Sequence, residues 1–392
     1  MSVERFVVDV PKATLDDLRE RLARTRWPEG VSENDWDHGT STAYLRGFVE
    51  HWLQVFDWRE QEAALNRLSH FRAEVGGLAI HFIHERGRGE RPLPLLLTHG
   101  YPDSFCRFLK VIPKLADPER HGGDPDDAFD VVVPSLPGFG FSDRPKKPGT
   151  TFQVGSLWHE LMTKVLGYPR FAAHGGDWGS TVTEQLARSH ADSIHGIHLT
   201  DVPFWHLLRP VKDPSRAEKK FLDVSQAWQT KEGAYALIQG TRPRSLARGL
   251  QDSPAGLAAW ILDKFHAWSD CHGDLETRFT KDELLTNVMV YWITGTIESS
   301  FLPYYDFMNG GPATWAAEAF KEWMGSTERV PAGFAIFPKD ISHPPRDWAE
   351  RFFDVRRWTE MPSGGHFAAM EEPDRFVDEI RAFFRPLRRP ML

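Results

Sequence analysis

The chain has 392 residues, 41% of them hydrophobic and 26% charged, a composition typical of a globular protein too long for one core. Its net charge of −8 excludes the basic surface of a nucleic-acid-binding protein. It has no run of about 18 apolar residues and no signal-peptide core, so we expect a cytoplasmic protein without a membrane anchor. Cys106 and Cys271 lie far apart in sequence, and we expect free thiols, no metal and no cofactor.

Residues 1–90 predict an N-terminal unit that begins with helices and ends with the first strands. A capping box at Thr14–Asp17 predicts the start of one amphipathic helix, and a second covers about 40–56. The segment Phe71–His84 predicts a hairpin that turns at Gly76-Gly77.

Residues 91–205 alternate short apolar strands with helices, which is typical of a parallel sheet. We expect strands at 93–98, 129–134, 171–174 and 194–200, and a helix from near Ser180.

Residues 206–310 predict helices instead, one of them capped by Ser253 with Pro254 in its first turn. Strands resume at 331–337 and 353–358, and an apolar-faced helix closes the chain. The pattern therefore predicts an α/β core in two parts, 91–205 and 311–392, interrupted by a helical cap.

The most informative segment is His174-Gly-Gly-Asp-Trp-Gly-Ser180, where a predicted strand runs through Gly-x-Asp-x-Gly into a helix. This is the pattern of a nucleophile elbow, with Asp177 where a lipase has serine. Because the turn is sharp, a Cβ at Gly175 or Gly179 would collide with neighbouring backbone. The alternative is an ordinary turn in which Asp177 caps the helix. The rest of the sequence favours the nucleophile.

Two further segments supply the partners of such a nucleophile. His99-Gly-Tyr-Pro102 ends an earlier strand, and the backbone N–H groups of Tyr101 and Trp178 can form an oxyanion hole. In the chain order nucleophile, acid, histidine, Asp340 follows a late strand and His366 lies in a Gly-rich loop before the last helix.

A carboxylate nucleophile indicates substitution at saturated carbon through an alkyl ester of the enzyme, so epoxides and haloalkanes both fit. Because an aspartate is ionised at neutral pH, we expect His366 to activate the water that hydrolyses the ester of Asp177. Asp340 would then orient the imidazole.

Opening an epoxide also requires an acid with a pKa near 10, which a tyrosine can supply. Four of the seven tyrosines fall within or at the end of the helical insertion: Tyr235, Tyr291, Tyr304 and Tyr305. A dehalogenase would instead need N–H donors for halide, so the tyrosines favour the epoxide.

These residues resemble the microsomal-type epoxide hydrolases, a family that includes the juvenile-hormone hydrolases and bacterial relatives, over nearly the whole chain. Four segments are similar to the family's N-terminal meander and to its nucleophile, acid and base motifs: Leu18–Pro28, Gly175–Gly179, Phe337–Asp340 and Gly364–Phe367. The resemblance implies an α/β-hydrolase fold with a helical cap. It also implies a small-molecule epoxide and water as reactants and a vicinal diol as product.

The resemblance further implies that Tyr235 and Tyr304 open the ring, with Tyr304 preferred to Tyr305 by its distance from the preceding Ser-Ser pair. The sequence departs from the family in two places. Tyr101 stands where tryptophan is usual, and Leu302 stands where arginine is common. The first departure leaves the backbone donor intact, and neither changes the reaction class.

Two other interpretations remain open. A haloalkane or haloacid dehalogenase would share Asp177, His366 and the fold. A non-catalytic ligand-binding α/β-hydrolase would lack a member of the triad, and none is missing. A homodimer is the assembly considered, and the role is either detoxification or natural-product biosynthesis.

Overall fold

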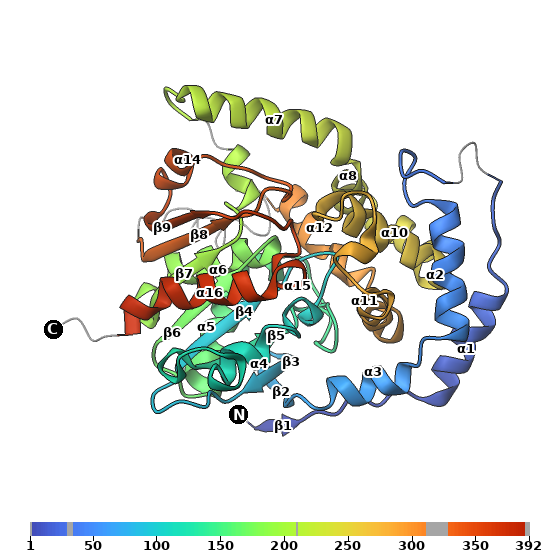
Figure 1. Ribbon diagram of the computed structural model, residues 1–392, viewed down its shortest axis with the longest axis horizontal. Coiled ribbons are helices and arrows are strands. Elements are labelled where there is room, and N and C mark those ends of the chain that lie inside the picture. The colour runs from blue at the N-terminus through green and yellow to red at the C-terminus, as the bar shows by residue number, and fades with distance from the viewer. Residues whose placement is uncertain (1, 30–33, 209–210, 311–327, 389–392) are drawn as a thin grey trace.

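A computed structural model describes residues 2–29, 34–208, 211–310 and 328–388 (Figure 1). Within these ranges the chain forms one nine-stranded sheet in the order β1-β2-β3-β5-β4-β6-β7-β8-β9. Its strands are β1 (Val3–Arg5), β2 (His70–Val75), β3 (Leu78–Glu85), β4 (Leu93–Thr98), β5 (Phe129–Pro134), β6 (Phe171–Gly175), β7 (Ile194–Leu199), β8 (Pro331–Ile336) and β9 (Asp354–Glu360). The predicted strands are all present.

The six strands from β4 to β9 pair in parallel, whereas β1, β2 and β3 pair antiparallel at one edge. The parallel strands β4, β5 and β8 are mainly apolar and buried because helices cover both faces of the sheet, whereas the edge strand β9 is mostly polar and partly exposed. In Figure 1, α4 (Ile112–Ala116) and α16 (Pro373–Phe384) lie on the near face. Helices α5 (Val154–Glu160) and α6 (Trp178–Ser189) lie behind it.

The sheet order reverses at β4, which has β5 on one side and β6 on the other. Ligands of open α/β sheets bind beyond the carboxyl ends of the strands at such a reversal. Thr98 at the end of β4 is in register with Gly175 at the end of β6, so the loops after these two strands begin side by side.

The helical insertion lies over this end of the sheet, and we propose that residues 206–310 form the cap. Its helices are α7 (Arg216–Glu232), α8 (Ala234–Thr241), α9 (Pro243–Asp252), α10 (Pro254–Trp268), α11 (Lys281–Thr294) and α12 (Leu302–Asn309). As predicted, Ser253 caps α10 by accepting a hydrogen bond from the Gly256 N–H. The start of the proposed second core part, 311–327, lies outside the described residues. That part also contains α14 (Arg346–Glu350) and α15 (Ala368–Glu371).

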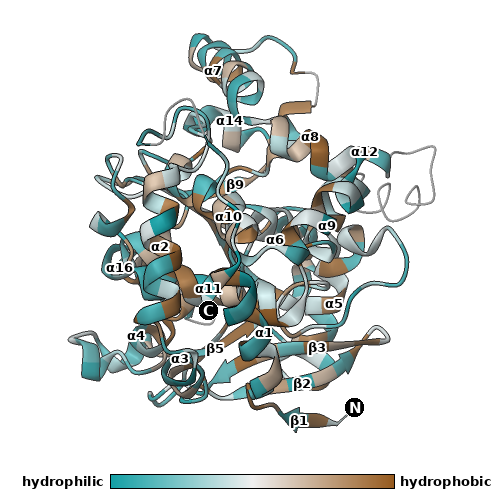
Figure 2. Cartoon of the chain, turned by 90° about the vertical axis from the view of Figure 1, so that its right-hand side faces the viewer, coloured by the Kyte–Doolittle hydropathy of each residue, from teal (hydrophilic) through white to brown (hydrophobic). Residues whose placement is uncertain are grey.

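An N-terminal strap, residues 2–65 as far as they are described, connects the edge of the sheet to the cap. Its strand β1 pairs with β2, and α1 (Lys12–Ala23) and α2 (Thr42–Gln54) pack against α10. Figure 2 views the molecule from this side. The strap also contains α3 (Trp58–Leu65), which the sequence did not predict.

The predicted capping box at Thr14–Asp17 is wrong. Helix α1 begins at Lys12 after Pro11, and the Thr14 N–H already donates to the Pro11 carbonyl. The fixed φ of proline and an ion pair between Lys12 and Asp16, at 2.7 Å, favour the earlier start.

Among the described residues no helix is long and apolar enough to cross a membrane. Cys106 and Cys271 are both buried and unpaired, as expected.

Candidate active site

The nucleophile elbow lies between β6 and α6, where the sequence places it. Asp177 has φ 57° and ψ −129°, a conformation that residues with a side chain rarely adopt and that costs about 1–3 kcal/mol. Although Asp177 stands at the N-cap position of α6, its side chain makes no capping hydrogen bond. The strained turn therefore presents the carboxylate away from the helix, and the alternative of a helix cap does not describe it.

The elbow is possible only because its neighbours are glycines. A Cβ at Gly175 would lie 2.0 Å from the carbonyl oxygen of Gly179, and one at Gly179 would lie 2.1 Å from that of Thr98. The predicted collisions with backbone are thus confirmed. A Cβ at Gly100 would lie 2.3 Å from Oδ1 of Asp177, so the loop after β4 also needs glycine to approach the carboxylate.

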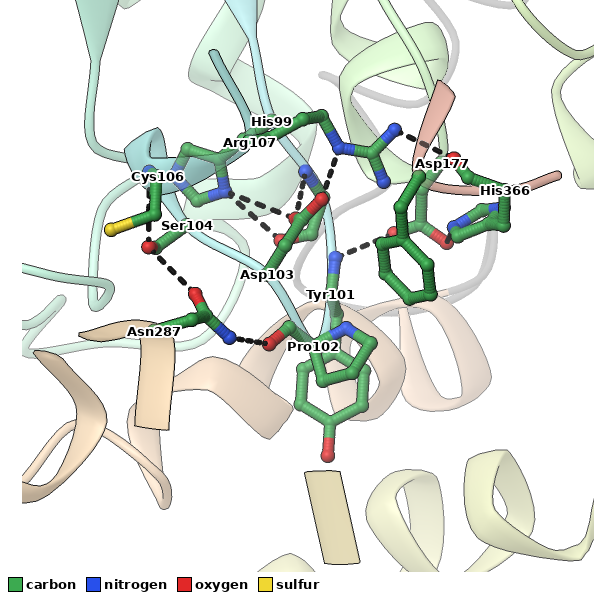
Figure 3. A network of polar contacts seen from close by, with 12 residues as sticks. His99, Tyr101, Pro102, Asp103, Ser104, Cys106, Arg107, Asp177, Asn287 and His366 are labelled. Atoms are coloured by element: carbon green, nitrogen blue, oxygen red, sulfur yellow. Dashed lines mark hydrogen bonds and ion pairs between the residues drawn. The ribbon is translucent and has the colours of Figure 1, made fainter. Parts of the chain in front are cut away.

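The loop after β4 supplies a donor to the carboxylate. The backbone N–H of Tyr101 donates to Oδ1 of Asp177 at 2.8 Å (Figure 3). Trp178 is the first residue of α6, so its N–H belongs to the helix terminus, where the partial positive charge favours an anion. Both predicted oxyanion donors therefore lie on the backbone next to Asp177.

His366 faces the other carboxylate oxygen. Its Nε2 lies 3.5 Å from Oδ2 of Asp177, and its Nδ1 lies 2.7 Å from Oδ1 of Asp340. Burial alone lowers the pKa of His366, but the Asp340 charge, the proximity of Asp177 and the hydrogen bond with Asp340 outweigh it and raise the pKa to about 10. The imidazole is thus held as a cation between two carboxylates.

A buried ion pair that sequence reasoning missed connects the two loops. Arg107 donates through Nε to Asp103, and its Nη1 donates to the backbone carbonyl of His366 at 2.9 Å (Figure 3). Asp103 in turn accepts the Gly100 N–H at 3.0 Å. Arg107 and Asp103 are at most 2% exposed. The pair therefore fixes the loop that contains His366 relative to the loop after β4.

Asp201, a second carboxylate that the sequence analysis did not single out, follows β7 and accepts hydrogen bonds from the elbow. Its Oδ1 accepts the Asp177 N–H at 2.9 Å, and its Oδ2 accepts the Ser180 hydroxyl at 2.8 Å. Burial, followed by the charge of Asp340, raises the pKa of Asp201 to about 7. The only sequence signal was its position at the end of a strand beside the elbow.

The two candidate ring-opening tyrosines come together from separate cap helices. Tyr235 of α8 and Tyr304 of α12 have ring centroids 5.7 Å apart, and Tyr304 lies edge-on to Trp178 at 5.1 Å. Burial raises the pKa of both phenols, and the charge of Asp177 raises it further. Tyr305 is half-buried, so the packing favours Tyr304 at this position.

The other cap tyrosine and the Tyr101 side chain hold the cap on the core. The Tyr291 hydroxyl donates to the Asp103 carbonyl at 2.7 Å. The Tyr101 hydroxyl accepts from Gln239 Nε2 at 2.8 Å and from Trp260 Nε1 at 2.7 Å. Tyr101 thus contributes its backbone to the carboxylate and its phenol to the cap.

In the described part of the chain no group of three or more histidine, cysteine, aspartate or glutamate side chains is placed to hold a metal ion. The polar groups around Asp177 instead form a hydrolytic arrangement of carboxylate, imidazole and phenols.

Comparison with known proteins assigns the family. Residues 3–108 match the model of the epoxide hydrolase N terminus, and residues 94–269 match that of the alpha/beta hydrolase fold. The chain is 34% identical to epoxide hydrolase 1 of Sus scrofa, over 97% of this chain and 88% of that protein. The chain belongs to the epoxide hydrolase family.

Other similar proteins support the assignment of this chain to the epoxide hydrolase family. A protein of Stigmatella aurantiaca is 43% identical over 98% of this chain and 85% of its own length. The structure of the Aspergillus niger epoxide hydrolase superposes with a TM-score of 0.84 at 30% identity, covering 99% of this chain and 97% of that one. The α/β-hydrolase fold and the epoxide hydrolase function predicted from the sequence are confirmed. The dehalogenase alternative is not favoured.

Proposed function

We propose that this epoxide hydrolase forms its diol through a covalent ester on Asp177, with His366 and Asp340 as base and acid and with Tyr235 and Tyr304 opening the ring. The single observation that carries this proposal is that the two oxygens of the Asp177 carboxylate have different contacts. Oδ1 accepts the Tyr101 N–H, whereas Oδ2 accepts no backbone N–H from the described residues and lies 3.5 Å from His366 Nε2.

In the first step, Oδ2 of Asp177 attacks an epoxide carbon while the carbon–oxygen bond of the ring breaks. A proton from the phenol of Tyr235 or Tyr304 goes to the ring oxygen, because an alkoxide leaving group is too basic to form unassisted. The negative charge of the carboxylate passes to the phenolate of the tyrosine that gave up its proton.

In the second step, water attacks the carboxyl carbon and gives a proton to Nε2 of His366. The negative charge that develops on Oδ1 is stabilised by the N–H groups of Tyr101 and Trp178. The bond between the carboxyl carbon and Oδ2 then breaks as His366 returns its proton to Oδ2, so the diol leaves with an oxygen that came from Asp177. The restored carboxyl group of Asp177 ionises again by giving its remaining proton to His366.

The charge of the elbow explains how one histidine serves the second step but not the first. The proximity of ionised Asp177 is one of the causes that raise the pKa of His366 to about 10. Ester formation moves that negative charge from Asp177 to the phenolate, so the pKa of His366 falls, and the imidazole can lose its proton to restore the phenol and then accept one from water. The base therefore becomes available only after the ester exists.

A single turnover in ¹⁸O-labelled water tests the covalent route. With enzyme in excess over epoxide, the diol should carry no label and Asp177 should gain one labelled oxygen. With substrate in excess, later turnovers should release labelled diol, which is the internal control. Label in the diol of the first turnover would refute the ester.

The His366→Gln variant tests the division between the steps. It should form the ester and fail to hydrolyse it, visible in intact-protein mass spectrometry as an increase equal to the mass of the epoxide. The double variant His366→Gln with Asp177→Asn should show no adduct. A folded His366→Gln protein without adduct would contradict the assigned role.

We further propose that the substrate is an apolar, aryl or lipid-like epoxide. Aromatic rings surround the elbow, with Phe204 edge-on to Trp178 at 5.2 Å and Phe307 at 6.3 Å. A panel of epoxides and chloroalkanes, assayed for both diol and halide, tests this preference. A homodimer, which sedimentation velocity tests, and a cytoplasmic location are further proposals.

A further inference from the structure

One face of helix α10 contacts three different parts of the site. Trp260, Lys264 and Trp268 follow one another at intervals of four residues, so they lie along one side of the helix. Trp260 donates to the Tyr101 hydroxyl, and the carbonyl of Trp268 accepts the His366 N–H at 2.8 Å. Lys264, between them, lies over Tyr235.

Lys264 is buried although lysine is almost never fully buried in proteins. The residue is 6% exposed, and its ammonium lies 5.0 Å from the centre of the Tyr235 ring. The same Nζ lies 5.7 Å from the Trp260 ring and 5.9 Å from the Trp268 ring. Three aromatic rings therefore surround a positive charge that has lost most of its water.

The counter-ion of Lys264 lies on the solvent side. Asp263 Oδ2 is 2.6 Å from Nζ, and the Asp263 side chain is 28% exposed against 8% for Lys264. Water screens the exposed carboxylate more than the buried ammonium. Of the two charges, the ammonium is the less exposed, and it lies against the Tyr235 ring.

We infer that Lys264 is a positioning residue for the acid step, because its ammonium over the ring of Tyr235 stabilises the negative charge that this phenol acquires as it protonates the epoxide oxygen. The inference rests on the role proposed for Tyr235. In this role Lys264 contacts neither the epoxide nor Asp177 and acts only through the phenol.

The electrostatic surroundings of Tyr235 explain why such a cation is useful. Burial and the charge of Asp177 both oppose ionisation of the Tyr235 phenol, so alone it is a weak acid at the site. A cation on the ring face is attracted by the aromatic electrons already in the neutral phenol, and more strongly once charge develops on the ring. The attraction is therefore greater in the transition state than in the ground state, as catalysis requires.

Pre-steady-state measurement of ester formation and ester hydrolysis, by rapid quench and mass spectrometry, tests the inference. Lys264→Met, which removes the charge and keeps a long apolar side chain, should slow ester formation by on the order of tenfold. Ester hydrolysis should not change, because it depends on His366 and water. Lys264→Arg should restore much of the rate, since it returns a cation to the aromatic rings.

The two candidate acids provide the decisive comparison. In a Tyr304→Phe background, where Tyr235 is the remaining acid, Lys264→Met should slow ester formation at least as much as in the wild type. In a Tyr235→Phe background, Lys264→Met should have no further effect. An equal effect in both backgrounds, or equal slowing of ester hydrolysis, would overturn the inference and assign Lys264 a structural role.

Failure of the underlying function is distinguishable from failure of the inference. If Tyr235→Phe alone leaves ester formation unchanged, the proposed role of Tyr235 is wrong, whatever Lys264 does. If Tyr235→Phe slows ester formation but Lys264→Met does not, only the role of Lys264 is wrong.

A matched control is available outside the site. Lys281 has an ion pair with Glu276 at 2.6 Å and lies 5.9 Å from the Tyr44 ring, so Lys281→Met removes a comparable pair without touching Tyr235. It should leave both rate constants unchanged. If Lys264→Met does not fold, Lys264→Gln combined with Asp263→Asn replaces the pair with neutral groups, and the same outcomes apply to it.

Discussion

The Tyr101 hydroxyl is expected to stabilise the packing of the cap on the core. Tyr101→Phe removes the acceptor of two hydrogen bonds and leaves the N–H groups of Gln239 and Trp260 without this partner. A buried donor left unpaired costs about 1–3 kcal/mol, and Trp260 is only half-buried, so the two together give about 2–4 kcal/mol. The free energy of unfolding should fall by that amount.

Urea unfolding followed by tryptophan fluorescence measures this loss, with a second tyrosine as control. The Tyr44 hydroxyl is buried and has no hydrogen-bond partner in the described part of the chain. Tyr44→Phe should therefore change the stability by less than about 0.5 kcal/mol or increase it. A Tyr101→Phe loss no larger than that of Tyr44→Phe would refute the reasoning. Ester hydrolysis should survive in Tyr101→Phe, because the donor to Asp177 is backbone.

Further predictions concern the charged groups and the phenols. Folding raises the pKa of His366 from 6.5 to about 10, so the protonated imidazole stabilises the folded state fully below pH 6.5 and this contribution is lost as pH rises toward 10. In urea unfolding, wild type should therefore lose stability relative to His366→Gln between these two pH values. Asp340→Asn should slow ester hydrolysis more than ester formation in rapid-quench assays, since the imidazole loses its orienting carboxylate. The pKa of Asp201 rises from 3.8 in the unfolded chain to about 7 in the folded protein, so wild type should lose stability relative to Asp201→Asn as pH rises from about 4 to 7. Asp201→Ala should lose the elbow hydrogen bonds and unfold at lower urea at every pH. Tyr235→Phe and Tyr304→Phe should each slow ester formation in part and together nearly abolish it, and a double variant with near-normal ester formation would remove both phenols from the mechanism.

The parallel core could be predicted closely because its signals are local. The strands β4 and β5 are short apolar runs bounded by turn residues, and their ends fall where the sequence placed them. The elbow could be predicted equally well, because the strained turn at Asp177 requires glycine at positions 175 and 179, which lie at fixed distances from it along the chain.

The contacts that complete the site could not be predicted in the same way. Arg107 reaches the His366 carbonyl across 259 positions, and no local pattern indicates which buried arginine will do so. In the sequence, Lys264 resembles an ordinary polar position of an amphipathic helix, and only the packing of α10 in the structure shows that it faces Tyr235. The start of α1 was misplaced because Thr14 and Asp17 carry a capping pattern inside a helix that Pro11 had already begun.

The N-terminal strap has a consequence for how this enzyme tolerates variation. Trp36 stacks on His266 with ring centroids 3.9 Å apart, and the Thr40 hydroxyl donates to the Ala259 carbonyl at 2.6 Å. The strap therefore packs against the outer side of α10, the side that faces away from the site. The inner side of the same helix carries the residues that touch Tyr101, Tyr235 and His366. Substitutions on the strap are therefore separated from the reacting groups by the width of one helix. A substitution in the strap that displaces α10 should therefore affect the site without contacting Tyr101, Tyr235 or His366.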